Sequence, residues 1–328
     1  MPAGSSELEQ LRALPREELF DRAWAVRQAN FPAVLAASAP GARRYSNACY
    51  TNHPESFVNI TLTGDSCGLD CDHCKGSLLK TMVSARDPGR LAELAGELAE
   101  RGTQGVLLSG GCDGNGAVPL ERHLPAVAAF KERGLKVLVH SGLVDRRQAV
   151  RLREAGVDQV LLDVIGDQRT IREVYHLDKE PEDYARALAC LREERLAVVP
   201  HVIIGLYYGR LGGEYRALEM IAANEPAHLV LVVLRPAPGT PMEHLAVPAA
   251  VETGRIAAVA RILHPKIPVS LGCARPAGRE KFRLEREAVD AGVNGVAYPL
   301  EETIRHAEER GLEVQFAEVC CSLLGRVG

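Results

Sequence analysis

The sequence predicts an α/β protein built as a (β/α)8 TIM-type barrel with an N-terminal helical extension. One pattern recurs along the chain: a charged amphipathic stretch ends in glycine, and a short Val/Leu/Ile run follows, as in AERGTQGVLLSG, KERGLKVLVHSG and REAGVDQVLLDV. Glycine supplies the left-handed residue that ends a helix. The apolar runs are typical of parallel strands that are buried on both faces. The repeated helix-to-strand connection therefore indicates a parallel sheet covered by helices.

Eight strands are expected in order, with helices between them. The helix after residue 87 illustrates the pattern: Asp87 supplies an N-cap, Pro88 suits the first helical position, and the apolar stripe that begins at Leu91 ends before Gly102. Eight such strands fit a closed barrel, with a doubly wound open sheet as the alternative. Residues 313–317 are a candidate for a further short strand. The expected strands lie near residues 57–63, 105–109, 136–140, 158–163, 198–204, 228–234, 267–272 and 293–297.

The N-terminal part of the chain differs in pattern from the rest. The stretch ELEQLRALPREELFDRAWAVRQAN indicates two helices that are broken near Pro15. We therefore divide the chain into an N-terminal helical extension, residues 1–50, and a barrel, residues 51–328. Because no long linker or low-complexity segment separates them, we expect the extension to pack on the barrel.

Composition and charge exclude several classes of protein. The chain has 328 residues, a net charge of −4 and only 5% aromatic residues, which argues against a nucleic-acid partner. No apolar run reaches membrane-spanning length, and the start MPAGSSELEQ lacks the basic and apolar regions of a secretory signal. The nine cysteines are therefore expected to be thiols, metal ligands or redox groups rather than disulfides. We expect a cytoplasmic protein that does not associate with membranes.

Three cysteines follow the first expected barrel strand at C-x3-C-x2-C spacing: Cys67, Cys71 and Cys74. Three thiolates on one short loop can converge on a single metal centre, and such soft ligands favour an iron–sulfur cluster or zinc. The loop leaves the carboxyl end of its strand, where barrel enzymes build their active sites. A four-iron cluster held by three cysteines leaves one iron open for a substrate or cofactor. The alternative is a Cys3His zinc site with His73 as fourth ligand, which is strained because His73 adjoins Cys74.

This motif, directly after the first strand of a βα barrel, resembles that of the radical S-adenosylmethionine (SAM) superfamily. The resemblance implies that Cys67, Cys71 and Cys74 hold a [4Fe–4S] cluster that binds SAM. The family has an aromatic residue before the third cysteine, where this sequence has His73. In such enzymes one electron cleaves SAM and releases a 5′-deoxyadenosyl radical, which takes hydrogen from an unactivated C–H bond.

The resemblance also implies where SAM lies. Gly110 and Gly111 resemble part of the family's Gly-Gly-Glu motif and are expected below the methionyl end, so that Gly111→Val would block the SAM pocket without unfolding the barrel. Ile203 and Gly205 match the family's adenine-contacting strand. Asp163 stands where the family often has a polar residue on the ribose, with a helix cap or loop hydrogen bond as the alternative.

Six cysteines lie outside this loop. Cys190 falls on an apolar helix face, where a free thiol is a common small core residue, so it is assigned no function. Taken singly, each of the others reads as a buried thiol, but together they suggest a second cluster. Its expected ligands are Cys273, Cys320 and Cys321, with Cys49 and Cys112 as less certain members.

Within the superfamily the sequence is most similar to the biotin-synthase-like branch. Three features carry this resemblance: the helical extension, the full set of barrel strands, and LGCARPAGRE after the seventh strand, where biotin synthase has an arginine that touches its auxiliary cluster. Cysteines that biotin synthase uses on its third and fifth strands are replaced here by His140 and His201 or their neighbours. The auxiliary site must therefore differ from that of biotin synthase.

The combination of SGGCD, GCARP and a terminal Cys-Cys pair resembles the two-component lipoyl synthases, which are related to this branch. That resemblance implies sulfur insertion into an octanoyl chain on a lysine of a carrier domain. It also implies a one-electron reductant such as ferredoxin or flavodoxin, and a second radical SAM protein as partner. No side chain is assigned a catalytic role from the sequence. The alternatives are another radical SAM enzyme, such as a methylase or ring-forming enzyme, and a zinc-stabilised barrel without catalytic activity.

Overall fold

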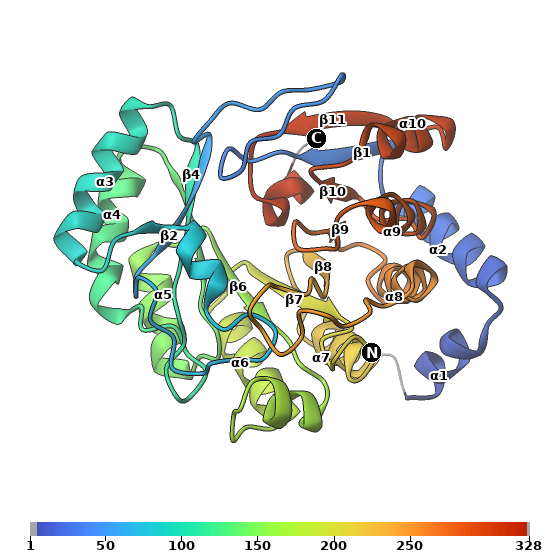
Figure 1. Ribbon diagram of the computed structural model, residues 1–328, viewed down its shortest axis with the longest axis horizontal. Helices are drawn as coiled ribbons and strands as arrows, with labels where there is room; N and C mark the ends of the chain where they lie inside the picture. Colours follow the sequence, from blue (N-terminus) through green and yellow to red (C-terminus); the bar gives the residue numbers. More distant parts are fainter. Residues whose placement is uncertain (1–4, 327–328) are drawn as a thin grey trace.

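The strands of the chain form one parallel sheet, curled like a barrel wall, with helices on its outer side (Figure 1). This computed structural model describes residues 5–326, so residues 1–4 of the expected extension and 327–328 of the expected barrel lie outside it. Within residues 5–326 the strand order is β11-β1-β10-β9-β8-β7-β6-β5-β4-β2-β3. The predicted α/β barrel-type fold is confirmed. The two edges, β11 and β3, are not paired with each other, so the sheet curls without closing through strand hydrogen bonds.

All eight strands expected from the sequence are present, and so is the further strand near residue 313. Glycine ends several of the helices that precede them, as at Gly156, which has φ 73° and follows α5. The strands are β2 (Phe57–Thr61), β4 (Gly105–Ser109), β5 (Lys136–His140), β6 (Gln159–Asp163), β7 (Val198–Ile204), β8 (Leu229–Val233), β9 (Val269–Leu271), β10 (Gly295–Ala297) and β11 (Glu313–Ala317).

Two strands were not predicted, and one of them corrects the description of the N-terminal extension. β1 (Val34–Ser38) lies within the segment assigned as helical, yet it pairs with β10 on one side and β11 on the other. Its sequence VLAAS carries little strand propensity, and only the two neighbouring strands make it extended. β3 (Val83–Ser84) is a short edge strand beside β2.

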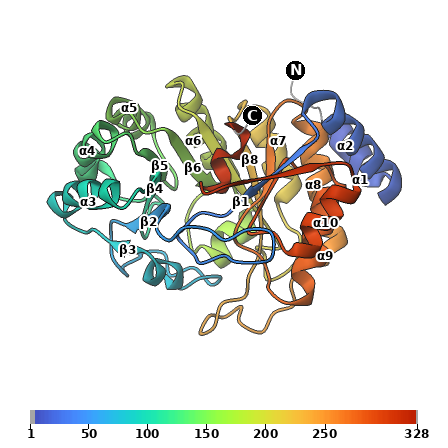
Figure 2. The same cartoon turned by 90° about the horizontal axis from the view of Figure 1, so that it is seen from above.

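The two predicted N-terminal helices are present and pack on the outside of the sheet's helical layer. α1 (Ser5–Ala13) and α2 (Arg16–Asn30) are separated near Pro15 and lie against α8, as Figure 2 shows. Arg255 of α8 donates to the carbonyl oxygens of Arg12 and Leu14 at 2.7 and 3.0 Å. The extension is therefore fixed to the barrel, as expected.

The outer helices follow the strands in order. The side chain of Asp87 accepts a hydrogen bond from the Arg90 amide, so the cap predicted for α3 is present. None of the helices in residues 5–326 combines the length and apolar character needed to cross a membrane. The helices are α3 (Pro88–Glu100), α4 (Val127–Glu132), α5 (Arg146–Ala155), α6 (Pro181–Glu193), α7 (Glu214–Ala222), α8 (Ala250–Leu263), α9 (Arg279–Asp290) and α10 (Glu301–Glu309).

Apolar side chains pack in two layers, one between sheet and helices and one inside the curl of the sheet. The inner layer also receives the C-terminal 3₁₀ helix η4 (Cys321–Arg326), whose Leu323 and Leu324 are buried there. Residues 39–56 cross from β1 to β2, and their Tyr50 ring stacks on Phe316 of β11 with centroids 4.4 Å apart. The inner layer is formed by Ala36, Ala39, Phe57, Leu138, Leu161, Val199, Val230, Val232, Ala297, Tyr298, Cys321, Leu323 and Leu324.

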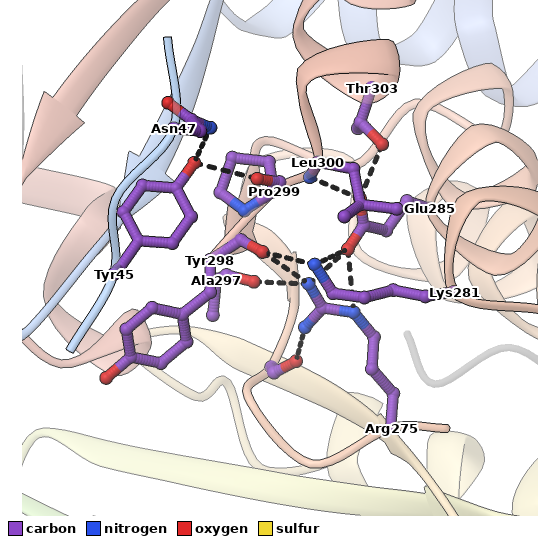
Figure 3. Close-up of polar contacts among 11 residues, drawn as sticks. Tyr45, Asn47, Arg275, Lys281, Glu285, Ala297, Tyr298, Pro299, Leu300 and Thr303 are labelled. Atoms are coloured by element: carbon purple, nitrogen blue, oxygen red, sulfur yellow. Dashed lines mark hydrogen bonds and ion pairs between the residues drawn. The ribbon is translucent and has the colours of Figure 1, made fainter. Parts of the chain in front are cut away.

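A buried ion-pair network fixes the loop after β9 (Figure 3). Arg275 and Glu285 are 2% and 0% exposed, so neither charge is balanced by water. The guanidinium donates through Nε to Glu285 Oε1 at 3.0 Å and through Nη1 to the Gly272 carbonyl at 2.5 Å. Its Nη2 donates to Glu285 and to the carbonyls of residues 297 and 298. Lys281 Nζ lies 3.0 Å from the same carboxylate.

The second carboxylate oxygen of Glu285 extends the network to α10. It accepts hydrogen bonds from the Leu300 amide at 2.9 Å and from the Thr303 hydroxyl. Nearby, the Tyr45 hydroxyl donates to the Pro299 carbonyl at 2.7 Å and accepts from Asn47. The donors of Arg275 are thus committed to the protein itself. This arginine anchors a loop, in contrast to the cluster contact implied by the resemblance to biotin synthase.

Removing one partner of this pair should destabilise the fold strongly. Glu285→Ala leaves the Arg275 charge buried and unpaired, and the expected loss is about 3–5 kcal/mol in the free energy of unfolding. The matched control is Glu280→Ala on the same helix. Its ion pair with Arg283 is exposed, so its loss should cost less than about 1 kcal/mol. Urea denaturation measures both variants, and equal losses for the two would contradict this account of the network.

Candidate functional site

The loop after β2 brings the first three cysteines together. Its chain reverses at Cys71, whose carbonyl accepts hydrogen bonds from the amides of Cys74 and Lys75 at 3.2 and 2.9 Å. The Cys71 and Cys74 thiols are close enough that each shifts the pKa of the other, and Cys67 lies close enough to act on Cys71 electrostatically. The sequence prediction that these thiols share one locality thus agrees with the structure.

The surroundings of these thiols favour a thiolate at Cys74. The neighbouring Cys71 thiol lowers the pKa of Cys74 against the effect of burial, and His73 adds to the lowering. In turn, the Cys74 thiol and burial raise the pKa of Cys71. Three soft sulfur donors on one turn fit an iron–sulfur cluster with one iron left free of protein ligands. His73 itself packs on Tyr175, with ring centroids 5.2 Å apart.

Side chains from distant segments hold the cysteine loop, and sequence reasoning missed them. The Asp72 amide donates to the Val174 carbonyl at 2.9 Å, and its carboxylate accepts from the Tyr208 hydroxyl at 2.8 Å. His176 lies 3.1 Å from the other oxygen of that carboxylate. In the sequence, only the charge of Asp72 between two cysteines hinted at these contacts, because its partners are more than a hundred residues away.

The glycine pair after β4 lies directly against the cysteine loop. The Gly111 amide donates to Thr63 Oγ1 at 2.7 Å, and the Gly68 amide donates to the Cys112 carbonyl at 2.7 Å. A Cβ atom built on Gly111 would lie 2.1 Å from the Ser66 carbonyl oxygen and 2.5 Å from Cys67 Cα. A valine at position 111 would therefore also displace the cysteine loop, in addition to entering the SAM pocket that it is expected to block.

Gly110 and Cys112 flank this contact. A Cβ atom on Gly110 would meet Thr63 Cγ2 at 3.0 Å, so this glycine also packs on the segment after β2. The Cys112 thiol is influenced by Cys67 and Cys74, and burial raises its pKa to about 12. The structure thus places Cys112 beside the first group of thiols.

The positions expected to contact the adenosyl part of SAM lie at the ends of β6 and β7. Gly205 has φ +80°, and a Cβ atom there would lie 2.0 Å from Pro248 Cγ. Its amide donates to Glu214 at 2.8 Å, so a turn requires this glycine irrespective of any ligand. Ile203 is partly exposed on the inner side of the sheet.

Asp163 Oδ1 lies 3.6 Å from His140 Nε2. Burial opposes ionisation of the Asp163 carboxyl group, but the His140 side chain outweighs it and lowers the Asp163 pKa to about 2.

The second group of thiols is assembled by the tertiary structure. Cys321 lies beside both Cys273 and Cys320, although Cys273 follows β9 and the other two begin the C-terminal turn. The Cys321 thiol lowers the pKa of Cys273 and of Cys320, and Arg275 and Arg43 lower that of Cys273 further.

Cys273 is exposed in the loop after β9, so its thiol is accessible. The other two candidates differ in position. Cys49 is exposed in the segment that crosses from β1 to β2, next to Tyr45. Cys190 lies on the outer helix α6, in agreement with the absence of an assigned function. All nine cysteines are free thiols.

Comparison with known families agrees with the position of the cysteine loop. Residues 61–209 match the model of the radical SAM superfamily, and residues 231–304 match the Biotin and Thiamin Synthesis associated domain. The chain is 26% identical to biotin synthase of Prochlorococcus marinus, covering 89% of this chain and 84% of that protein. It is 29% identical to biotin synthase of Xanthomonas euvesicatoria, with 89% and 80% covered.

Solved structures share the fold at low sequence identity. Methylornithine synthase (PylB) superposes with a TM-score of 0.63 at 17% identity, covering 96% of this chain and 95% of that one. The hydrogenase maturase HydG from Carboxydothermus hydrogenoformans gives 0.64 at 16% identity, with 98% and 77% covered. The radical SAM domain, with its [4Fe–4S] cluster and SAM, and the biotin synthase relatives agree with the family expected from the cysteine spacing. These comparisons show a radical SAM domain over residues 61–209 and fit the biotin-synthase-like branch of the radical SAM superfamily.

Proposed function

We propose that the chain is a sulfur-inserting radical SAM enzyme that acts on an octanoyl chain carried by a protein, as a component of a lipoyl synthase. The observation that supports this proposal is the presence of two separate groups of three thiols at the same end of one curled sheet. One group suits the SAM-binding cluster, and the other suits a second cluster that could serve as sulfur donor.

Cys67, Cys71 and Cys74 would hold the first cluster. When bound, that cluster and SAM supply a 5′-deoxyadenosyl radical, which abstracts hydrogen from an unactivated carbon. The contribution of the chain is positional: Asp72, through Tyr208 and His176, fixes the turn that carries the thiols. Gly111 lets the loop after β4 approach that turn closely.

Cys273, Cys320 and Cys321 would hold the second cluster, which would supply sulfide. Adjacent cysteines can bind different irons of one cluster, and the arginines near Cys273 favour its thiolate. At this place the chain departs from the arrangement implied for biotin synthase, because Arg275 is committed to Glu285 and backbone carbonyls.

A second candidate is sulfur insertion into a small free molecule, as the name of the biotin synthase relatives describes for those proteins. The two candidates share the radical and the sulfur donor and differ in the substrate. Anaerobically purified enzyme with reductant, SAM and either an octanoylated carrier domain or free small acids distinguishes them. Product on the carrier lysine supports the lipoyl proposal; product only from the free acids contradicts it. Ferredoxin or flavodoxin serves as electron donor in this assay, with and without a second radical SAM protein.

Each cysteine of the first group should be required for SAM cleavage. Cys67→Ala, Cys71→Ala and Cys74→Ala each remove a thiolate from the turn, so 5′-deoxyadenosine formation should fall below about 1% of wild type and iron by about four atoms per chain. Cys190→Ala is the matched control, since that thiol lies on an outer helix. Wild-type 5′-deoxyadenosine yield from any one of the three variants would contradict the assignment.

The C-terminal pair should be required for sulfur transfer and not for SAM cleavage. In the double variant Cys320→Ala/Cys321→Ala, iron should fall by about four atoms per chain while 5′-deoxyadenosine formation persists and sulfur-containing product disappears. Cys273→Ala should behave in the same way, because its thiol contacts Cys321. Cys49→Ala tests the exposed candidate alongside. Unchanged iron content and product in the double variant would show that the pair only packs the inner layer.

A further inference from the structure

Two histidines and an aspartate form a cluster on the inner side of the sheet, outside both groups of thiols. His140 and Asp163 are the last residues of the neighbouring strands β5 and β6, and His201 lies at the centre of β7, paired with Asp163. Residues two positions earlier on the same strands belong to the apolar inner layer: Leu138, Leu161 and Val199. Since alternate residues of a strand face the same side, the three polar side chains form the next layer inside the curl.

The ligand atoms of this cluster are close together. One donor atom from each of the three side chains lies within 4.8 Å of the others. His140 Nε2 is 3.6 Å from Asp163 Oδ1, a distance too long for a hydrogen bond but close to the separation of two ligands on one metal ion. The His140 and His201 ring centroids are 5.8 Å apart.

Neighbouring groups orient two members of the cluster. His201 Nδ1 lies 3.2 Å from the Val199 carbonyl, which can only accept, so Nδ1 carries the proton and Nε2 keeps its lone pair. This is the arrangement in which metal-binding histidines are usually held. Asp163 accepts a hydrogen bond from the Tyr175 hydroxyl at 3.4 Å through its other oxygen. The cluster therefore has supports outside its ligand atoms.

The cluster lies between the two groups of thiols. On one side Tyr175, which contacts Asp163, packs on His73 of the cysteine loop and accepts from the Cys71 thiol through its carbonyl at 4.0 Å. On the other side Cys320 acts electrostatically on His140. The side chains of His140 and Asp163 are 26% and 27% exposed, so they line an accessible internal space.

We infer that His140, Asp163 and His201 form a binding site for a divalent transition-metal ion, with zinc as its best-suited occupant. Two imidazoles and one carboxylate are a ligand set that zinc accepts. An ion pair between His140 and Asp163 alone would not account for the second imidazole, whose oriented lone pair faces no hydrogen-bond donor among the described residues. Three protein ligands leave at least one coordination position for a water or for an anionic group of a substrate.

This inference does not depend on the proposed lipoyl synthase activity, because none of the three metal ligands belongs to either group of thiols. It is tested on holoenzyme reconstituted anaerobically with iron and sulfide, to which one equivalent of zinc is added. Zinc K-edge absorption should show nitrogen and oxygen ligands at about 2.0–2.2 Å. Zinc bound mainly to sulfur, at about 2.3 Å, would mean that it occupies cysteine positions and would overturn the inference.

Variants identify the ligands. His140→Gln and His201→Gln should each weaken zinc binding at least about 100-fold, because even changes beyond the metal's own ligands cost 10- to 100-fold. His244→Gln, at an exposed position on another segment, is the matched control and should bind as wild type does. Asp163→Asn keeps the side-chain shape and tests the carboxylate should a histidine variant fail to fold. A folded His201→Gln protein with wild-type zinc affinity would overturn the inference.

Discussion

The structure depends on one constraint: the carboxyl ends of parallel strands in a single curled sheet all face the same mouth. Every described strand pairing is parallel, so each return connection runs over the outer face and each loop that follows a strand lies at this mouth. The cysteine loop, the glycine pair and the loop of Cys273 therefore lie at one mouth although they follow strands far apart in the sequence. Their chemistry depends on the sheet and not on proximity in sequence.

The C-terminal segment brings a second group of thiols into the interior of the curled sheet. After β11 the chain enters the interior, where Ser38 donates to the Val319 carbonyl at 2.7 Å and Gln159 donates to the Ser322 carbonyl at 3.1 Å. The β10 residue Gly295 makes room, since a Cβ atom there would lie 2.5 Å from Leu324 Cδ1. The terminal cysteines thus reach Cys273 because β1 and β11 widen the sheet and allow the chain end to fold inward.

The buried arginine shows how the same residue type can serve a different purpose in related sites. Arg275 lies in a loop where the resemblance implied contact with a cluster, yet its hydrogen-bond donors bind Glu285 and backbone carbonyls. A buried cation must be paired, and pairing it fixes the loop. What the arginine then offers the neighbouring Cys273 is electrostatic: a positive charge that favours the thiolate. The anchor and the charge are two consequences of one interaction.

The sequence by itself determined the order of the strands and helices apart from β1 and β3, the N-terminal helices and the first cysteine group. Each of these is a local pattern: glycine after an amphipathic helix, an apolar run, or three cysteines within one turn, where the chain itself holds the partners close. Asp163, His140 and His201 were each noted in the sequence, but not as one group, because their contacts join separate strands. The sequence likewise indicated Cys273, Cys320 and Cys321 only as candidates.

Only the tertiary structure decided which distant residues meet. Val34–Ser38 forms a strand because it pairs with β10 on one side and β11 on the other. Its alanine-rich sequence does not predict a strand. Gly111 proved to pack on the cysteine loop, and Cys112 proved to lie beside Cys67. The cluster of His140, Asp163 and His201 exists because three parallel strands are in register. Register is set by hydrogen bonds between segments, so no local pattern in the sequence records it.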